Sequence, residues 1–455
     1  PIKQNGKTPI RQLADRMKRV AVTEQDPVER AKNFKEVCLG YDNERAVKEA
    51  SRCLHCKNPK CVEGCPVSIN IPEFINYIKD NDIEGAAKEI AKYSSLPAVC
   101  GRVCPQESQC EGKCVLGIKG EPLAIGKLEK YAADWARENY VDVSFKEESN
   151  NIKVAIIGSG PAGLTCAGDL AKKGYDVTIF EALHEPGGVL VYGIPEFRLP
   201  KQEVKKTINN ILELGIEVKY NQELGKNLNL EDLKEEYDAI LLGFGANISC
   251  KMGVEGEKLQ GVFGGNELLE YNRHPNYKGM DVAVIGGGNV AMDCARTIKR
   301  LGAKEVTVIY RRAREQMPAE NKEIKDAMDE GIKFLFQNNI VKIIGNDKVK
   351  ELELIETKLI QKDSETRLVP VNIENSNYKI SMDYIVMALG SEPATFVQKL
   401  GLKLDKWGNI KIDENYQTSD SKIYACGDLA GIRKTVAWAA YSGREAANKI
   451  IEKIK

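Results

Sequence analysis

The sequence predicts an α/β protein with two nucleotide-binding units, preceded by a small helical domain rich in cysteine. Three observations lead to this fold class. Eight of the thirteen cysteines lie between Cys53 and Cys114, short apolar runs alternate with helical segments after about residue 150, and two glycine-rich turns each follow such a run. A chain of 455 residues is also too long for one ordinary core and fits about three domain-sized units.

Residues 1–145 form the expected helical domain. The segment Ile71–Ile78 repeats apolar residues at helical spacing, and Pro72 suits the first turn of a helix. Such a domain has little core of its own, so bound metal would have to stabilise it. The polar stretch from Ser144 to Asn151 has no apolar rhythm and predicts a linker to the rest of the chain.

Two runs of four cysteines dominate this domain. Their spacings are Cys53-x2-Cys56-x4-Cys61-x3-Cys65 and Cys100-x3-Cys104-x5-Cys110-x3-Cys114. A proline follows Cys65 and Cys104, and short loops that end in Cys-Pro are typical of iron–sulfur cubanes, which need thiolate ligands. Zinc is the alternative because paired thiolates also form tetrahedral sites, although zinc pairs usually have longer gaps between them. We therefore expect two interwoven iron–sulfur clusters.

Five short runs after the linker have the pattern of strands buried on both faces of a parallel sheet. They are Val154–Ile157, Val177–Phe180, Ala239–Leu242, Val282–Ile285 and Val306–Ile309. The first and fourth runs each begin a unit of strand, glycine turn, helix and second strand. The chain therefore contains an internal repeat of nucleotide-binding halves.

The first glycine turn has the spacing that binds a dinucleotide. Its residues are Gly158, Ser159, Gly160, Pro161, Ala162 and Gly163, followed by an expected helix from Leu164 to Lys173. The three glycines allow a tight turn, a close approach of the backbone to a pyrophosphate, and close packing of helix on strand. Glu181 ends the next strand, where its carboxylate would accept hydrogen bonds from a ribose diol. The alternative is a glycine turn that serves packing alone.

The second glycine turn predicts NADPH as its nucleotide. Its residues are Gly286, Gly287, Gly288, Asn289, Val290 and Ala291, with Ala291 in the place of the third glycine. Arg311 and Arg312 follow the next strand, where an acidic residue would indicate NADH. Arginines there can pair with a 2′-phosphate. The alternative is that they begin a solvated basic helix.

Two further segments complete a resemblance to the two-dinucleotide-binding flavoproteins of the glutathione reductase type. They are Gly187–Pro195 and the return of the chain at Gly427–Asp428. The resemblance implies a FAD domain (residues 146–250 and 390–455) interrupted by an NADPH domain (251–389), with Gly188 binding the cofactor and Arg198 near the flavin ring. Some members carry a redox-active cysteine pair beside the flavin. This chain has only isolated cysteines there, so the electrons must leave the flavin by another route.

The cysteine domain resembles that of glutamate synthase small subunits, dihydropyrimidine dehydrogenases and the large subunits of NADH-dependent ferredoxin:NADP oxidoreductases. The resemblance implies that Cys53, Cys56, Cys61 and Cys114 bind one [4Fe–4S] cluster, and that Cys65, Cys104 and Cys110 bind the second. Its fourth ligand would be Glu129, in the segment Ile125-Gly126-Lys127-Leu128-Glu129. The alternatives are that Cys100 is the fourth ligand, or that Glu129 is a solvated helix residue.

These features predict an NADPH-dependent oxidoreductase subunit that contains FAD and two [4Fe–4S] clusters and has no catalytic side chain of its own. The large subunit of an electron-bifurcating NADH-dependent ferredoxin:NADP oxidoreductase, or its relative the sulfide dehydrogenase, is favoured because Gly120–Gly126 follows Cys114 after a short gap. The alternatives are a glutamate synthase small subunit and a non-catalytic scaffold subunit. We expect a second redox subunit as partner, with ferredoxin as a further candidate.

Charge and hydropathy exclude two other classes of partner. Lys and Arg together number 66, as do Asp and Glu, so no overall field attracts nucleic acid. No apolar stretch approaches the roughly eighteen residues that a membrane span needs, and the first residues do not have the pattern of a secretory signal. The sequence thus predicts a cytoplasmic protein that binds neither nucleic acid nor a membrane.

Overall fold

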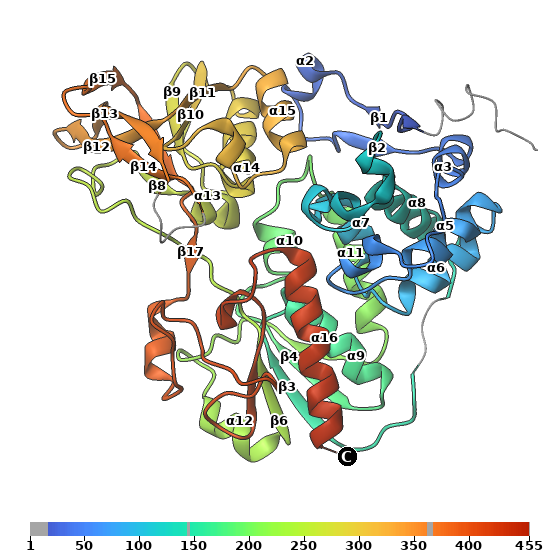
Figure 1. The fold of residues 1–455 in the computed structure, drawn as a ribbon. Helices are drawn as coiled ribbons and strands as arrows, with labels where there is room; N and C mark the ends of the chain where they lie inside the picture. The colour runs from blue at the N-terminus through green and yellow to red at the C-terminus, as the bar shows by residue number, and fades with distance from the viewer. Residues whose placement is uncertain (1–16, 143–145, 362–366, 455) are drawn as a thin grey trace, which may run out of the picture.

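The structure, a computed structural model, describes residues 17–142, 146–361 and 367–454. It contains a group of N-terminal helices and two five-stranded parallel sheets, which occupy three regions of the molecule (Figure 1). In Figure 1 the N-terminal helices lie at the upper right, one sheet below and the other at the upper left. This arrangement confirms the predicted fold class.

The N-terminal region is mainly helical. Its elements are β1 (Thr23–Glu24), α2 (Pro27–Arg30), β2 (Cys38–Gly40), α3 (Asn43–Ala50), α4 (Lys60–Glu63), α5 (Ile71–Lys79), α6 (Ile83–Ala91), α7 (Pro97–Val103), η1 (Gln106–Ser108), η2 (Glu111–Lys113), η3 (Val115–Ile118) and α8 (Ile125–Glu138). The helix expected from Ile71 is α5, with Pro72 in its first turn and Phe74, Ile75 and Ile78 buried on one face. Apolar spacing and proline placement therefore locate this helix correctly.

The core of the N-terminal region is shared with the sheet that follows it. Phe74, Leu96 and Leu128 belong to one continuous cluster of buried apolar side chains with Leu170 and Ile450 of the neighbouring helices. A further tie between the two regions is Arg444, which pairs with Asp169 at 2.7 Å and also donates to the carbonyl of Tyr93. The small domain expected to have little core of its own thus gains one by packing against its neighbour.

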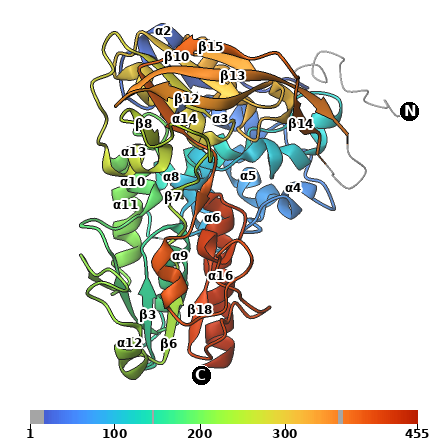
Figure 2. The same ribbon diagram turned by 90° about the vertical axis from the view of Figure 1, so that its left-hand side faces the viewer.

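The first sheet has the strand order β18-β6-β3-β4-β5, with every pair parallel. Its strands are β3 (Lys153–Ile157), β4 (Asp176–Phe180), β5 (Glu217–Lys219), β6 (Ala239–Leu242) and β18 (Ile423–Ala425), and the associated helices are α9 (Pro161–Lys172), α10 (Val189–Tyr192), α11 (Lys201–Leu212), α12 (Leu230–Glu236), η5 (Thr395–Lys399), η6 (Gly427–Ala430) and α16 (Val436–Lys453). Helix α9 begins three residues earlier than expected because Pro161 occupies its first turn. The long helix α16 runs beside α9 and this sheet (Figures 1 and 2).

The second sheet has the order β11-β10-β9-β16-β8 and is also parallel throughout. Its strands are β8 (Val262–Gly264), β9 (Asp281–Ile285), β10 (Glu305–Tyr310), β11 (Lys333–Phe336) and β16 (Tyr384–Met387), and its helices are α13 (Gly265–Tyr271), α14 (Asn289–Arg300), η4 (Arg314–Gln316) and α15 (Asn321–Asp329). An antiparallel layer lies beside it (Figure 2) and consists of β12 (Asn338–Gly345), β13 (Val349–Ile360), β14 (Val369–Asn372) and β15 (Tyr378–Ser381). All five strands predicted from the sequence are found in the two sheets.

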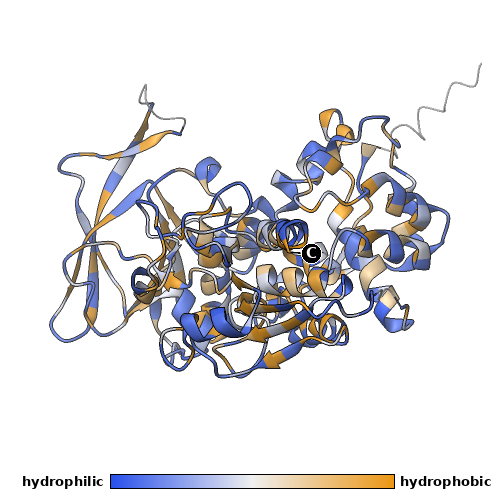
Figure 3. Cartoon of the chain, turned by 90° about the horizontal axis from the view of Figure 1, so that it is seen from below, coloured by the Kyte–Doolittle hydropathy of each residue, from blue (hydrophilic) through white to orange (hydrophobic). Residues whose placement is uncertain are grey.

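Two short strands pair where the chain passes between the sheets. They are β7 (Ile248–Ser249) and β17 (Ser391–Glu392), which run antiparallel. Of the predicted linker, Ser144 and Phe145 lie outside the described residues, and residues 146–152 contain no helix or strand. Apolar residues concentrate in the strands and on the inner faces of the helices (Figure 3). In the described parts of the chain, no helix combines the length and the apolar character that crossing a membrane requires.

Candidate functional site

The first glycine turn has the close contacts that its sequence predicts. Gly158 has a φ of +98°, and a Cβ atom at Gly163 would lie 2.0 Å from the carbonyl oxygen of Gly158. A side chain at either position would therefore break the turn or push α9 away from the sheet. At Gly160 the nearest atom to a Cβ would be 4.0 Å away, so the backbone is open on that side. This is the place where a pyrophosphate can approach the N-terminus of α9.

Glu181 lies at the end of β4 beside this turn. Its carboxylate accepts hydrogen bonds from the backbone N–H and the hydroxyl of Ser159, at 3.0 and 2.5 Å, and from the N–H of Leu183 at 2.9 Å. The Ser159 hydroxyl also accepts from the N–H of Gly187 at 2.9 Å. The structure thus brings the turn and the predicted ribose-binding carboxylate together.

Gly427 and Asp428 follow β18 and lie at the end of the first sheet where the first glycine turn also lies. Gly427 has a φ of +66°, and a Cβ there would lie 3.2 Å from the side chain of Ala162 on α9. Burial raises the pKa of Asp428 to about 6, although Lys434 opposes the shift. A half-buried carboxylate at this position fits a group that offers it hydroxyl donors.

The loop from Gly187 to Lys201 follows β4 in the first sheet and contacts helices of the second sheet. A Cβ at Gly188 would lie 3.0 Å from the Cα of Gly160, so this loop covers the first glycine turn. At its other end, Arg198 pairs with Asp293 of α14 at 2.8 Å and with Glu323 of α15 at 3.3 Å. The side chain of Arg198, which is predicted to lie near the flavin ring, is 7% exposed and pairs with helices of the second sheet.

Lys201 fixes this loop from inside, a role that no pattern in the sequence indicated. Its ammonium group donates hydrogen bonds to the carbonyls of Leu190, at 2.9 Å, and Ile194. Burial lowers the pKa of Lys201 to about 8, against the opposing effect of Glu196. The loop that covers the first glycine turn is therefore held by a side chain at the start of α11.

The second glycine turn has the same construction. Gly286 has a φ of +139°, and a Cβ there would lie 2.2 Å from the carbonyl oxygen of Ala388. Gly288 precedes α14 and has no neighbour nearer than 4.0 Å to a Cβ, so a phosphate can approach there. Asn289 accepts a hydrogen bond from the N–H of Glu320 at 3.2 Å, and Ala291 is fully buried. The sequence missed that the ring of Tyr310 lies against Gly287, 2.6 Å from where a Cβ would stand.

Arg311 and Arg312 follow β10 beside this turn. Arg311 is exposed, while Nε of Arg312 donates to the carbonyl of Leu368 at 3.1 Å. The hydroxyl of Thr357 donates to the carbonyl of Arg311 at 2.9 Å, so the antiparallel layer supports the arginine pair. Two arginines at the end of this strand, one with its guanidinium group held and one with an exposed side chain, fit the predicted contact with a 2′-phosphate.

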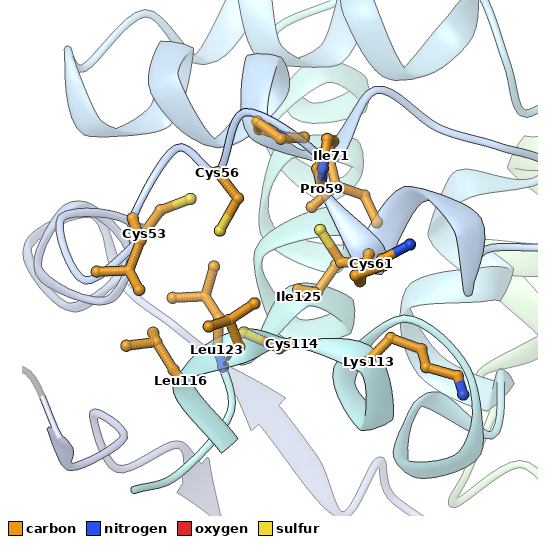
Figure 4. A pocket seen from close by; sticks show the side chains of 14 residues that line it. Cys53, Cys56, Pro59, Cys61, Ile71, Lys113, Cys114, Leu116, Leu123 and Ile125 are labelled. Atoms are coloured by element: carbon orange, nitrogen blue, oxygen red, sulfur yellow. Dashed lines mark hydrogen bonds between the residues drawn. The ribbon is translucent and has the colours of Figure 1, made fainter. Parts of the chain in front are cut away.

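Four thiols line one pocket in the N-terminal region. They belong to Cys53, Cys56, Cys61 and Cys114, whose side chains point towards a common centre (Figure 4). The N–H of Leu123 donates to Sγ of Cys114 at 3.4 Å, and His55 has a φ of +46° that turns the loop around the pocket. In the described part of the chain, no three His, Cys, Asp or Glu side chains converge on one ion-sized point. Thiols spread around a shared space, with a backbone amide aimed at sulfur, fit a multi-iron cluster.

A second group contains Cys65, Cys104, Cys110 and Glu129. Burial and the nearby Glu129 raise the pKa of Cys65 to about 12, and burial, Glu111 and Cys65 raise that of Cys110. Glu129 is 6% exposed, and its Oε1 has no hydrogen-bond partner. An unpartnered buried carboxylate oxygen beside three thiols fits a metal ligand, because leaving it unpaired is costly.

Cys100 lies close to the same group. Its thiol is next to that of Cys104 and to the hydroxyl of Ser94, and its charge raises the pKa of Glu129 in addition to burial. Both candidates for the fourth ligand are thus near the second thiol group. The two candidates differ in their partners. Oε1 of Glu129 has no hydrogen-bond partner, whereas the thiol of Cys100 already has hydrogen-bonding neighbours.

A buried network of charges joins the N-terminal region, the loop and the second sheet. Glu330 accepts hydrogen bonds from Arg30 at 3.0 Å, Arg296 at 2.8 Å and Arg300 at 2.6 Å, and all four side chains are at most 2% exposed. The ring of Phe197 lies 3.9 Å from the guanidinium carbon of Arg300. The sequence missed this network, and the only available signal was the i, i+4 spacing of Arg296 and Arg300.

The comparison with protein families divides the chain into two parts. Residues 152–443 match the family described as pyridine nucleotide-disulphide oxidoreductase. Residues 30–141 match the family described as dihydropyrimidine dehydrogenase domain II, 4Fe-4S cluster. The first match contains both glycine turns, and the second contains all eight clustered cysteines and Glu129.

Individual relatives and solved structures agree with this division. The glutamate synthase [NADPH] small chain of Halomonas elongata is 37% identical over 461 residues, which cover 95% of this chain and 97% of the relative. The NADPH-Fe(3+) oxidoreductase subunit beta of Geobacter sulfurreducens is 36% identical over 393 residues, 83% of this chain and 58% of the relative. FprA from Mycobacterium tuberculosis, solved in complex with NADPH, has the same fold over 67% of this chain and 84% of its own, with a TM-score of 0.60 at 19% identity.

The match to the Halomonas elongata protein extends over nearly the full length of both proteins. The two thiol groups and the two glycine turns lie within it. The class of cofactors follows from the two matched families: a flavin, a pyridine nucleotide and an iron–sulfur centre. The chain therefore belongs to the family of glutamate synthase small chains, which are NADPH-dependent oxidoreductases that join a 4Fe-4S domain to a pyridine nucleotide-disulphide oxidoreductase fold.

Proposed function

We propose that this chain takes a hydride from NADPH onto FAD and passes the electrons singly through two [4Fe–4S] clusters to a partner redox subunit. The observation that carries the proposal is the loop from Gly187 to Lys201. It lies against Gly160 in the first glycine turn and pairs through Arg198 with Asp293, which is on the helix that follows the second glycine turn. One element thus lies between the two predicted nucleotide sites.

The two nucleotides would bind at the two glycine turns. We assign FAD to residues 146–250 and 390–455, with Gly158, Gly160, Pro161, Ala162, Gly163, Glu181, Gly188, Arg198, Gly427 and Asp428 as the contacting residues. We assign NADPH to residues 251–389, with Gly286, Gly288, Asn289, Ala291, Arg311 and Arg312. The pairing of β7 with β17 near both boundaries supports this division.

Positioning is the main task of the protein in such a reaction. When bound, FAD accepts a hydride and releases electrons one at a time, and iron–sulfur clusters carry single electrons. The chain needs no side-chain acid or base for this transfer, because holding the two rings in line supplies the catalysis. Lys201 and Arg198 fix the covering loop on its two sides, and this loop would exclude water from the flavin.

The two thiol groups would hold the two clusters. We assign Cys53, Cys56, Cys61 and Cys114 to the first cluster and Cys65, Cys104, Cys110 and Glu129 to the second. The orphaned oxygen of Glu129 supports its assignment over Cys100. Because a carboxylate is a harder ligand than a thiolate, the second cluster should differ from the first in reduction potential.

Two candidates remain for the physiological assembly. The first is the large subunit of an electron-bifurcating NADH-dependent ferredoxin:NADP oxidoreductase, which the short segment Gly120–Gly126 after Cys114 favours. The second is a glutamate synthase small subunit, which the end-to-end similarity to the small chain of Halomonas elongata favours. A small flavin-reductase partner distinguishes the first assembly, and a large amidotransferase partner the second.

Anaerobic titration of the purified chain with NADPH tests the proposal. The chain should contain about eight irons and one FAD, and NADPH should bleach the flavin and then reduce the clusters. Lone protein should reduce artificial dyes but make no glutamate from glutamine and 2-oxoglutarate. Zinc in place of iron, or a flavin that NADPH does not reduce, would refute the electron-transfer function and favour a scaffold subunit.

A further inference from the structure

The first thiol group is the more exposed of the two. All four cysteines of the first group are partly exposed, whereas in the second group only Cys65 is partly exposed and Cys104 and Cys110 are each 7% exposed. Under the proposed function, a protein acceptor can approach a cluster in the first group more closely than one in the second. The surface around the first pocket is therefore where the acceptor has to be recognised.

Apolar side chains surround the mouth of this pocket. Leu54 and Val115 line it and are 46% and 38% exposed, and Ile118, on the same short helix as Val115, is 77% exposed. Three large apolar side chains left in water beside one opening are typical of an interaction surface.

The same surface is positively charged. Lys60 and Lys113 line the pocket, and the exposed Lys57 and Lys119 are their neighbours in the two cysteine loops. Lys60 pairs with Glu63 at 2.7 Å. For Lys57, Lys113 and Lys119, the part of the chain that the structure describes contains no ion pair. The exposed carboxylates beside these loops, Glu63, Glu73 and Glu121, are fewer than the four lysines.

We propose that this surface, formed by Leu54, Val115, Ile118, Lys57, Lys113 and Lys119 and called the port below, docks an acidic electron-transfer protein. The inference rests on the proposed function, because it requires a cluster in the first thiol group. Positive charge around an apolar centre steers a negatively charged partner, and the apolar contact then holds it. A partner whose own redox centre lies beneath an acidic surface fits both features.

The electron balance sets the number of docking events. Oxidation of one NADPH to NADP⁺ releases a hydride, which amounts to two electrons and one proton. Two single-electron transfers through the port therefore reduce two one-electron acceptors, or one acceptor twice, and the proton passes to solvent. No further oxidant or reductant is required.

The test uses the holoenzyme and a small acidic ferredoxin as the probe. Lys57→Glu, Lys113→Glu and Lys119→Glu together should weaken binding about tenfold at low salt and remove most of its salt dependence. Carbodiimide cross-linking, which joins lysine to a contacting carboxylate, should link the probe to these lysines in the parent. The matched control replaces Lys348, Lys350 and Lys358, exposed on the antiparallel layer, by Glu. With the same change in net charge, it should alter binding less than about twofold.

Further variants distinguish a loss of partner binding at the port from damage to the cluster. Iron content is measured in every variant. If the Glu variants lose iron, the three lysines are replaced by Gln instead, and the expected loss of binding is about half as large. Ile118→Ser should weaken binding about fivefold at high salt as well, since its contribution is apolar. Equal weakening by the port and control triples, or cross-links that map elsewhere, would overturn the port. Failure of NADPH to reduce the flavin in the parent would instead refute the proposed function.

Discussion

Replacing Glu330 by Gln removes the central charge of the buried network while keeping the shape of the side chain. In the parent, burial opposes ionisation, but hydrogen bonds from Arg300 and Arg296 hold the pKa of Glu330 below its ordinary value. Glu330 is therefore charged at neutral pH. Its loss leaves Arg30, Arg296 and Arg300 with one compensating charge fewer in a site where all three are at most 2% exposed.

The expected cost follows from the burial of the partners. Removing one member of a buried ion pair costs about 3–5 kcal/mol, because the remaining charge is desolvated without compensation. Asp326 still pairs with Arg30 at 2.7 Å, and the amide oxygen of the substituted side chain would still accept one hydrogen bond, so the loss should stay within that range. In a unit of this size 1 kcal/mol shifts Tm by about 2–4 °C, which gives a fall of about 10 °C.

Thermal unfolding of the Glu330→Gln holoenzyme, followed by calorimetry, measures this fall. The matched control is Asp329→Asn, because the exposed Asp329 is the last residue of α15, next to Glu330, and pairs with Lys325. That control should lose less than about 1 kcal/mol. If both variants shift Tm equally, the network does not stabilise the contact between the N-terminal region and the second sheet.

Three further changes test the sites. Arg311→Ala with Arg312→Ala should raise the Kd for NADPH by at least about tenfold and leave that for NADH nearly unchanged, because only NADPH carries the 2′-phosphate; equal losses would give the pair another role. Glu129→Ala should alter the electron paramagnetic resonance signal and potential of one cluster only, and unchanged spectra would favour Cys100 as the ligand. Burial, with help from Glu323 and Glu107 and against Arg198 and Lys127, raises the pKa of Glu320 to about 8. This folded-state pKa lies above the ordinary value of 4.5. The parent therefore loses stability as pH rises from about 4.5 to about 8. Over that range, the Tm of Glu320→Gln should rise relative to the Tm of the parent. A Tm difference that does not change with pH would contradict this.

Local patterns predicted the strands and both glycine turns. Gly158, Gly163 and Gly286 are required by contacts within their own strand–turn–helix units or with an adjacent strand, so short sequence motifs contain most of the information. The start of α9 lies three residues before the predicted one, because the glycine-turn motif extends into the first turn of the helix, where Pro161 stands.

Contacts between distant segments were not predictable in the same way. Arg30 and Glu330 are 300 positions apart, and nothing in the sequence around either residue indicates that they meet. Arg198 was expected at the flavin, but its pairing with Asp293 depends on how the second sheet packs against the loop. Spacing alone also left the choice between Cys100 and Glu129 open. The unpartnered oxygen of Glu129 became visible only in the folded chain.

The pairing of β7 with β17 has a consequence for how this protein can change. Since Ile248–Ser249 and Ser391–Glu392 are neighbours, both ends of the intervening segment meet at one place, and we expect this segment to be exchangeable as a cassette. A replacement with different cofactor preference would have to preserve the charged residues that face partners outside the cassette, among them Asp293, Arg296, Arg300, Glu323, Asp326 and Glu330. Recombination would thus alter nucleotide specificity, while these positions constrain which donors are compatible.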